Sequence, residues 1–193
     1  MDIYVNMKND RVADGVLGPY TRYCLWVSGC NRKCKGCISP ESHDMYKGTP
    51  YSTGSLAWQI IPSDVEGITI SGGEPFLQAK ALCELISMVK NHRDIGVIIY
   101  TGYLYEQLTE LPYGKELTGL CDLIIDGPYI KELDDGKSLR GSSNQRIIPI
   151  TDRYKDSLSL YGKYTRKVQT DSSNKLEIKY IGLPTNSIYK GEN

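Results

Sequence analysis

Four short segments of mainly aliphatic and aromatic residues, each followed by glycine or a polar residue, constrain the fold of this chain most strongly. They span residues 20–28, 67–71, 96–101 and 121–126. Strands so rich in Ile, Val and Leu, alternating with helices, are typical of a parallel sheet covered by helices, so the sequence predicts an α/β fold. In such sheets ligands bind at the C-terminal edge of the strands. At that edge the chain carries Gly29-Cys30, Gly72-Gly73-Glu74, Thr101-Gly102 and Asp126-Gly127.

Helical periodicity is clearest between Leu77 and Lys90, where apolar residues recur on one helix face. Residues 55–61 and 106–111 are shorter helix candidates, and residues 146–150 and 176–181 are further strand candidates. Five or six strands favour an open, partial TIM-like barrel over a closed eight-stranded one, which takes about 250 residues. We predict a core domain over residues 1–150 and a polar, Tyr-rich extension over residues 151–193 that packs on or continues the core.

The composition excludes several classes of function. The 193 residues carry 23 Lys and Arg against 23 Asp and Glu, and the resulting net charge of 0 argues against a broadly basic nucleic-acid binder. No apolar run approaches the roughly 18 residues that a membrane span needs. Residues 1–10 are too polar for a signal peptide. We therefore expect a cytoplasmic protein with no membrane and no direct nucleic-acid partner.

The six cysteines fall into two groups. Cys30, Cys34 and Cys37 lie within eight residues, as Cys-x3-Cys-x2-Cys, in a loop that directly follows the first predicted strand. The others are scattered through apolar segments, where free cysteine is usually a core residue: Cys24, Cys83 and Cys121.

Three converging thiolates can hold one metal centre, but a structural zinc site or an ordinary four-iron cluster takes four protein ligands. His43 on the following loop and Cys24 on the preceding strand are the candidates for a fourth ligand. If neither binds, one iron keeps an open position for a substrate, as in catalytic metal sites. A zinc site or a plain electron-transfer cluster are the alternatives.

The other strand-end motifs are less specific when taken alone. Ser71-Gly72-Gly73-Glu74-Pro75 is compatible with a simple turn before a helix. Residues 140–146 are compatible with a polar loop that binds an anion through its arginines and backbone amides. His43 and His92 are the two histidines, and neither has a Ser or Asp constellation, which argues against a hydrolytic triad.

Taken together, these motifs resemble the radical S-adenosylmethionine (SAM) enzymes, and among them the activating proteins of anaerobic ribonucleotide reductase. The resemblance covers about residues 15–150 and implies a partial TIM-like barrel of the radical SAM type. Beside the cysteine loop with its small Gly36 and Pro40-Glu41, it rests on Ser71-Gly72-Gly73-Glu74-Pro75, Tyr100-Thr101-Gly102-Tyr103, Asp126-Gly127-Pro128-Tyr129 and residues 140–146. Gly18-Pro19-Tyr20-Thr21-Arg22 resembles a Gly-Pro-Gly-x-Arg element of that family, with Tyr20 in place of the second glycine.

The resemblance implies that Cys30, Cys34 and Cys37 hold a 4Fe-4S cluster whose fourth iron is chelated by SAM. It also implies that glycine backbone lies against the methionyl end of SAM and that Glu74 holds the SAM ammonium group. An acceptor-only carboxylate suits a cationic amine. The residues assigned in this way to cofactor binding are Gly36, Cys37, Ile38, Gly72, Gly73, Glu74, Thr101, Gly102, Asp126, Arg140 and Asn144. Arg140 and Asn144 are equally candidates for contacting the substrate or organising the loop.

An activity follows from the same resemblance. A one-electron donor such as flavodoxin or ferredoxin reduces the cluster, and SAM is cleaved to methionine and a 5′-deoxyadenosyl radical. The radical takes hydrogen from a glycine near the C-terminus of a large glycyl-radical enzyme, the anaerobic ribonucleotide reductase. Tyr20, Trp26 and the extension depart from the family pattern and keep open a small-molecule, peptide or other protein substrate. A non-enzymatic iron–sulfur or zinc module is the alternative from a different class.

Overall fold

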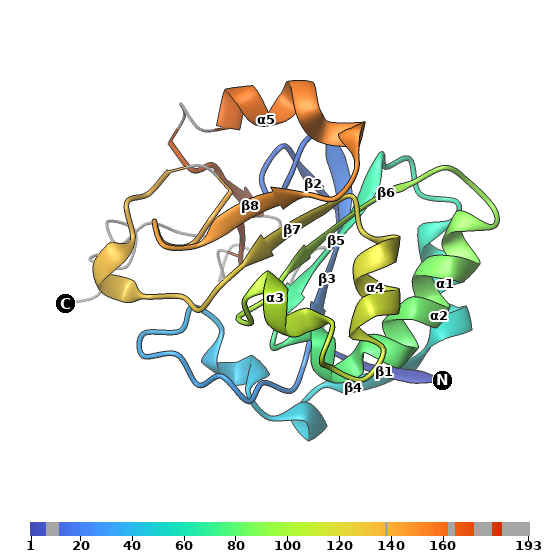
Figure 1. Ribbon diagram of the computed structural model, residues 1–193. Coiled ribbons are helices and arrows are strands. Elements are labelled where there is room, and N and C mark those ends of the chain that lie inside the picture. Colours follow the sequence, from blue (N-terminus) through green and yellow to red (C-terminus); the bar gives the residue numbers. More distant parts are fainter. Residues whose placement is uncertain (7–11, 138, 162–164, 172–178, 183–193) are drawn as a thin grey trace.

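The computed structural model describes residues 1–6, 12–137, 139–161, 165–171 and 179–182. It shows one large mixed sheet with most of the helices gathered against one side (Figure 1). The strands are β1 (Asp2–Val5), β2 (Val12–Asp14), β3 (Thr21–Val27), β4 (Thr49–Ser52), β5 (Gly67–Gly72), β6 (Gly96–Tyr100), β7 (Leu123–Asp126), β8 (Arg146–Pro149), β9 (Val168–Asp171) and β10 (Lys179–Gly182). The α-helices are α1 (Thr53–Ile60), α2 (Ala79–Lys90), α3 (Tyr105–Leu108), α4 (Gly114–Leu120) and α5 (Lys155–Tyr161).

The four central strands of the sheet are parallel. The order is β4-β1-β3-β5-β6-β7-β8, with β2 paired to β3, and the pairs β3/β5, β5/β6 and β6/β7 run in the same direction. The four strands predicted from the sequence are these four. Helices α2 and α4 lie between successive parallel strands in the chain and supply the crossovers that parallel pairing needs.

On both sides of the four central strands, the outer strands pair antiparallel with their neighbours. β1 and β4 continue the sheet beyond β3, and β8 lies antiparallel to β7. The strand predicted at residues 146–150 therefore exists, but it returns along β7 instead of extending the parallel set. The partial-barrel curvature stays a prediction, as does the domain boundary at residue 150.

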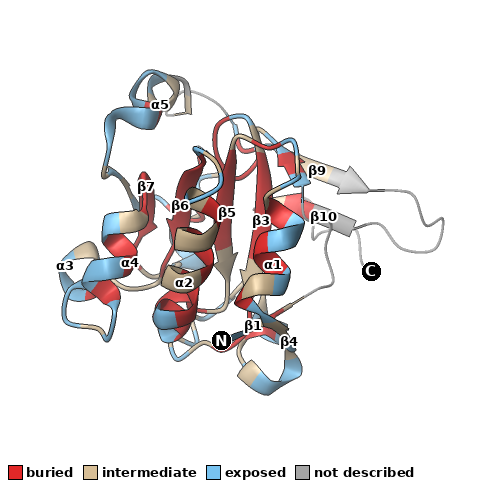
Figure 2. Cartoon of the chain, turned by 90° about the vertical axis from the view of Figure 1, so that its right-hand side faces the viewer, coloured by how far each residue is buried: buried red, intermediate tan, exposed pale blue. Residues whose placement is uncertain are grey.

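One face of the sheet is covered by α1, α2 and α4, whose buried sides face the strands (Figure 2). Leu56 and Ile60 of α1 and Leu82 and Leu85 of α2 are fully buried there. Burying each such side chain contributes about 1.5–3 kcal/mol. The helix predicted from Leu77 instead begins at Ala79, because residues 75–78 form a 3-10 turn that the Glu74 side chain caps.

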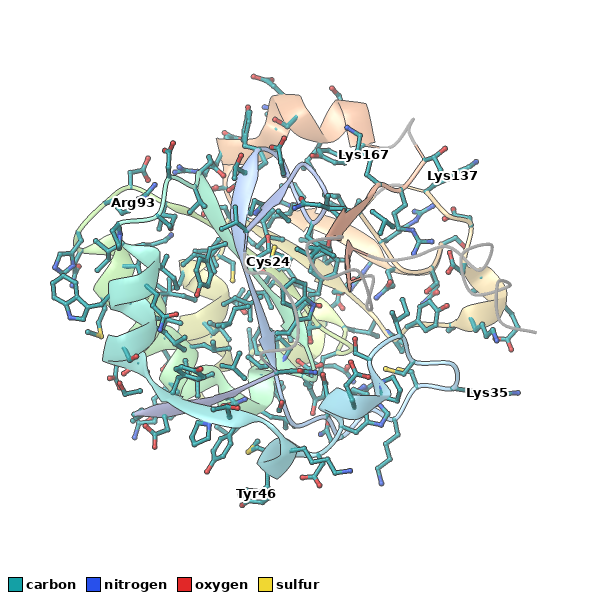
Figure 3. The ribbon with its side chains drawn as sticks, turned by 180° about the vertical axis from the view of Figure 1, so that it is seen from behind. Cys24, Lys35, Tyr46, Arg93, Lys137 and Lys167 are labelled. Carbon is teal, nitrogen blue, oxygen red and sulfur yellow. The ribbon has the colours of Figure 1, made fainter. Side chains whose placement is uncertain are left out.

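The opposite face is covered by the loop that follows β2 and by part of the extension. Cys24, Ile98 and Leu123 of the strands pack there with Leu17 and with Tyr154, which is almost fully buried. Figure 3, seen from behind, places Cys24 in the interior of the molecule. Tyr154 therefore ties part of the polar extension to the core. The composition of the extension did not single this residue out.

A buried arginine joins the N-terminal ends of the central strands to the extension. The Arg22 guanidinium donates to Thr69 Oγ1 at 2.6 Å, to Glu66 Oε2 at 2.7 Å and to the Tyr154 hydroxyl at 2.8 Å. The Gly-Pro-x-x-Arg element thus has a structural role at the edge of the sheet that lies opposite the strand ends carrying the glycine motifs. Tyr20 adopts φ +62°, a left-handed conformation that glycine tolerates best.

Sequence patterns did not predict the short peripheral elements β1, β2, β4, β9, α4 and α5. The strands among them have three or four residues each, too few for a period of two to stand out. The strand predicted at residues 176–181 lies partly outside the described residues, and residues 179–182 form β10, which pairs with β9. None of the helices in the described ranges is both long and apolar enough to cross a bilayer.

Candidate functional site

A pocket of about 850 Å³, including its open mouth, lies at the C-terminal edge of the parallel strands. The lining residues are Leu17, Trp26, Cys30, Arg32, Cys34, Cys37, Ile38, Ser39, Ser71, Gly72, Gly73, Tyr100, Thr101, Gly102, Gly127, Tyr129, Gly141, Gln145 and Gly182. The prediction that this edge of the sheet forms a ligand site is consistent with the pocket found there.

The cysteine loop is closed at its base by backbone hydrogen bonds to the segment that follows it. Gly29 N donates to Ser42 O at 2.8 Å, and Cys30 N donates to His43 O at 3.0 Å. Inside the loop, Cys37 N donates to Cys34 O at 3.1 Å. These bonds hold the loop as one unit over the end of β3, while Lys35 at its tip points outward (Figure 3).

The three thiols of the loop are free, half-buried and electrostatically coupled. All three line the pocket and none is in a disulfide. Burial raises the pKa of Cys30 and of Cys37, and the neighbouring thiolates raise both pKa values further. A cationic iron centre would offset this mutual repulsion and keep the thiols ionised. The donor set therefore fits an iron–sulfur cluster.

The spacing of the thiols and one backbone N–H of the loop bear on the kind of metal centre that the loop could hold. In the described part of the chain, no three His, Cys, Asp or Glu side chains are close enough together to hold one metal ion. Cluster thiolates each bind a different iron and stand farther apart than the ligands of one ion. The Arg32 backbone N–H also points at Cys30 Sγ, at 3.5 Å, and hydrogen bonds to sulfur tune such clusters.

Neither candidate for a fourth protein ligand lines the pocket. Cys24 is buried inside the sheet, and its thiol lies 3.8 Å from the Arg22 carbonyl oxygen, to which it donates. His43 lies at the base of the loop, and its Nε2 is buried without a hydrogen-bond partner among the described residues. The pocket therefore presents three cysteines and an open side.

Gly72 and Gly73 are required by the packing of β5 against the cluster strand. Gly72 has φ +103°, and a Cβ there would lie 2.5 Å from Val27 O. A Cβ on Gly73 would overlap the carbonyl oxygen of Gly29. Because both positions also line the pocket, the same two residues let the backbone approach the cysteine loop and leave room for a ligand.

Glu74 lies behind the pocket wall and not in it. Its carboxylate is buried and accepts hydrogen bonds from the Thr101 hydroxyl and the Gly102 N–H, both at 2.8 Å, and from Phe76 N at 3.1 Å. Burial raises the pKa of Glu74, and these three donors together with Arg32 oppose the rise. Glu74 thus holds Thr101 and Gly102, which line the pocket. Direct contact with SAM stays a prediction.

The structure places three further predicted residues outside the pocket lining. Asp126 is fully buried and accepts from Tyr105 N and from the guanidinium of Arg146. Arg140 pairs with Asp135 at 2.8 Å. The Asn144 side chain donates to Pro128 O at 2.8 Å, which matches the loop-organising alternative. Their roles toward a cofactor stay predictions.

Of the two remaining predicted residues, Ile38 lines the pocket and Gly36 does not. Gly36 adopts φ +74°, and a Cβ there would lie 2.8 Å from the Lys131 side chain. Glycine therefore lets the cysteine loop turn and pack closely against residue 131.

The sequence analysis missed several lining residues. Gln145 accepts hydrogen bonds from Gly141 N at 2.8 Å and from Ser142 N at 3.1 Å, and it donates to Gly127 O at 2.8 Å. Gln145 thereby joins two walls of the pocket. Its place in the motif at residues 140–146 was the sequence feature that could have marked it as a site residue. Leu17 carried no signal, since an apolar residue near a strand is expected in the core, and Trp26 stood out only as a departure from the family pattern.

The fold and the cysteine loop define an α/β protein with a three-cysteine site suited to an iron–sulfur cluster. In agreement, residues 16–148 match the family model described as a 4Fe-4S single cluster domain. The chain is also 34% identical over 154 residues to the anaerobic ribonucleoside-triphosphate reductase-activating protein of Enterobacteria phage T4, covering 76% of this chain and 96% of that protein.

Two bacterial proteins of the same name are similar to a comparable extent. The one from Vibrio cholerae is 35% identical over 145 residues, which cover 69% of this chain and 91% of that protein. The one from Escherichia coli is 31% identical over 146 residues, which cover 69% and 92%. The chain belongs to the family of anaerobic ribonucleoside-triphosphate reductase-activating proteins.

Proposed function

We propose that this chain is a radical SAM enzyme that installs a glycyl radical on an anaerobic ribonucleotide reductase. One observation carries the proposal: three free thiols line the same pocket as the glycine-rich ends of β5 and β6, and no fourth cysteine or histidine is among the described residues that line it. The cysteines would hold the cluster, and the adjoining space would hold SAM against its open iron. The names of the relatives supply the reductase as the target.

The chemistry of the cofactors is that a reduced cluster cleaves SAM into methionine and a 5′-deoxyadenosyl radical. The protein positions the two cofactors and excludes competing reactions. The fixed backbone of the cysteine loop and of Gly72-Gly73 brings the two cofactors together. The Glu74 carboxylate accepts from the Thr101 hydroxyl and from the Gly102 N–H, and it thereby fixes these two lining residues in a site too buried for them to reorganise freely.

Arg32 covers the cluster side of the pocket. Its guanidinium stacks on the Tyr103 ring at 4.7 Å, and the Asn31 amide donates to the Tyr103 hydroxyl at 2.7 Å. Both contacts tie the cysteine loop to the segment after β6. A positive charge held at this point favours the negative charge of a reduced, thiolate-ligated cluster. Flavodoxin or ferredoxin is the proposed electron donor.

The experiment is anaerobic reconstitution with iron and sulfide, followed by SAM and dithionite, with 5′-deoxyadenosine measured by chromatography. We expect 5′-deoxyadenosine and a SAM-dependent change in the electron paramagnetic resonance signal of the reduced cluster. Addition of the anaerobic reductase should then produce a glycyl-radical signal. Cys34→Ser should abolish 5′-deoxyadenosine formation, the SAM-dependent change in the cluster signal and the glycyl-radical signal. The matched control Cys83→Ser should keep all three.

Two other outcomes separate the alternatives. A full cluster with no 5′-deoxyadenosine under any reductant would overturn the proposal in favour of an electron carrier. Production of 5′-deoxyadenosine without a radical on the reductase would keep the reaction class and overturn the reductase as substrate.

A further inference from the structure

Lysine side chains that the pocket does not use lie on the outer side of the cysteine loop. Residues 30–39 contain two lysines and one arginine and no acidic residue, in a chain whose net charge is 0. Lys33 and Lys35 are exposed, and Lys35 points away from the molecule (Figure 3). The Arg32 backbone N–H, in contrast, points at Cys30 Sγ. The loop therefore turns its thiols toward the pocket and its lysines toward the solvent.

A third lysine reaches the same surface from a distant part of the chain. Lys131 is exposed, and its side chain lies against Gly36, where a Cβ would be 2.8 Å from Lys131 Cδ. The apolar stem of this lysine packs on the cysteine loop, which leaves the ammonium group to the solvent. Together with the two exposed lysines of the loop, Lys131 forms what we call the lysine surface. Glu41 and Glu132 lie near it in the sequence and offset only part of its charge.

The lysine surface covers a short route from the solvent to the cluster. In the proposed function SAM fills the pocket, so the inner side of the cysteine loop is occupied and its outer side stays open. The three cysteines are only half-buried, so a protein docked on the outer side would come close to the cluster. An approach from the N-terminal ends of the strands would instead have to cross the length of the sheet. A protein that delivers electrons therefore has reason to bind at the lysine surface.

We infer that the lysine surface, formed by Lys33, Lys35 and Lys131, docks the acidic face of an electron-transfer protein. The inference rests on the proposed function, in which the cluster is reduced from outside. One electron passes from the partner to the cluster, so the partner is oxidised and the cluster is reduced, and no covalent bond forms or breaks. Complementary charge speeds such an encounter, and the effect falls with ionic strength. A nucleic acid is disfavoured as the partner, because three lysines neutralise few phosphates.

The test measures how fast a protein donor reduces the reconstituted protein in the presence of SAM. The probe is an acidic flavodoxin in its hydroquinone form, mixed anaerobically with the protein, and its oxidation is followed by absorbance. Lys35→Glu combined with Lys131→Glu should lower the second-order rate constant about tenfold at low ionic strength, and the difference should shrink as salt screens the charges. Lys155→Glu is the matched control and should leave the rate unchanged. That lysine is exposed on α5, which lies far from the cysteine loop (Figure 1).

A small reductant separates docking from a change in the cluster itself. Reduced methyl viologen is a cation that needs no docking surface, so the double variant should react with it as fast as the wild type or faster. A fall in rate with both reductants would mean an altered cluster and would overturn the inference.

Binding without electron transfer gives a second readout. In calorimetry with oxidised flavodoxin, the double variant should bind about fivefold more weakly than the wild type. Lys35→Gln removes one charge without reversing it and should give a smaller loss, which keeps the test valid if the double variant does not load its cluster. An unchanged flavodoxin rate, an equal loss in Lys155→Glu, a rate that ignores salt, or tighter binding of a single-stranded oligonucleotide than of flavodoxin would each overturn the inference.

Failure of the inference and failure of the proposed function give different results. If flavodoxin reduces the cluster in a manner that depends on Lys35 and Lys131, but no 5′-deoxyadenosine forms with any reductant, the proposed function fails and the docking surface stands. If 5′-deoxyadenosine forms with dithionite and the reaction with flavodoxin ignores both lysines, the inference alone fails.

Discussion

The Thr101 hydroxyl donates a 2.8 Å hydrogen bond to Oε1 of Glu74, which joins the ends of β6 and β5 at the wall of the pocket. The other carboxylate oxygen accepts from the Gly102 N–H at the same distance. One buried side chain therefore fixes two lining residues that lie 27 and 28 positions farther along the chain.

Glu74→Ala should weaken SAM binding and lower the free energy of unfolding by about 1–3 kcal/mol, because the Thr101 hydroxyl and the Gly102 N–H lose their acceptor. Iron content should stay close to that of the wild type, since Glu74 is not an iron ligand. Calorimetric titration with SAM and a colorimetric iron assay check both points. Glu74→Gln keeps one acceptor oxygen, so its SAM affinity and its free energy of unfolding should lie between those of the wild type and those of Glu74→Ala. A wild-type SAM dissociation constant in Glu74→Ala would show that this wall does not contact SAM.

Alkylation should divide the cysteines in two groups. After iron is removed with a chelator, iodoacetamide should label Cys30, Cys34 and Cys37 in the folded protein, and the intact cluster should protect them. Cys24 should stay unlabelled in both states at pH 8, because burial raises its pKa to about 12 and leaves almost no thiolate. Its labelling should increase only as the pH approaches 12. Peptide mass spectrometry gives the result, and labelling of Cys24 as fast as Cys34 would contradict the division.

Tyr20→Gly should raise the free energy of unfolding by up to about 1 kcal/mol. The left-handed backbone at Tyr20 costs about 1–2 kcal/mol for a residue with a Cβ, and the greater freedom of glycine in the unfolded chain offsets only part of that gain. The side chain is 59% exposed, so little packing is lost. Tyr20→Ala, the control, keeps the strain and should not be stabilised in urea denaturation. Equal stability of the two variants would rule out backbone strain as the cause.

Tyr154→Phe should lower the free energy of unfolding by about 1–2 kcal/mol. The hydroxyl accepts from Arg22 and donates to Glu66, both at 2.8 Å, and each partner loses a hydrogen bond in a largely buried site. Thermal denaturation measures the change. Tyr46→Phe, at an exposed position, is the control and should have no effect. A Tyr154→Phe protein with the same free energy of unfolding as the wild type would mean that this hydroxyl does not tie the extension to the core.

Asp94→Asn should remove part of the acid sensitivity of the protein. A hydrogen bond from Arg153 lowers the pKa of Asp94 in the folded state, so the pair stabilises the fold above the unfolded pKa of about 3.9 and is lost as the pH falls through the folded value. Asp94 is 87% exposed, which limits the contribution to less than about 1 kcal/mol. Urea denaturation from pH 2 to pH 7 should show the two proteins converging at low pH. In an Arg153→Met background the difference should vanish at every pH.

Much of the central fold was predictable because it depends on local pattern. The buried faces of β3, β5, β6 and β7 require near-continuous apolar runs, and α2 requires an amphipathic repeat, so each leaves a mark in the sequence. The antiparallel direction of β8 leaves no mark in the sequence, because the pattern of a four-residue strand does not specify the direction in which it pairs. Leu77 shows the limit of periodicity: it fits the helical repeat but is 42% exposed, since the Glu74 cap starts a 3-10 turn first.

The site was predictable in its motifs and not in its contacts. Cysteine spacing and strand-end glycines are sequence features, and the three cysteines and most of the glycines that they mark do line one pocket. Asp126 and Asn144 were marked by the same motifs but hold neighbouring loops, through Arg146 and through Pro128 O. Tyr100 and Gln145 line the pocket because of the direction in which their strand or loop places them, which a motif does not specify.

By itself, the sequence determined that three thiols lie together and that glycine-ended strands meet at one edge of an α/β sheet, because both depend on residues close in the chain. Only the tertiary structure decided that Glu74 supports the pocket wall from behind, and that Arg22 joins the core to Tyr154. It likewise decided that two nitrogens of the buried Arg166 find no acceptor among the described residues. These relationships join residues from 27 to 132 positions apart, and packing in three dimensions sets which buried donors find acceptors.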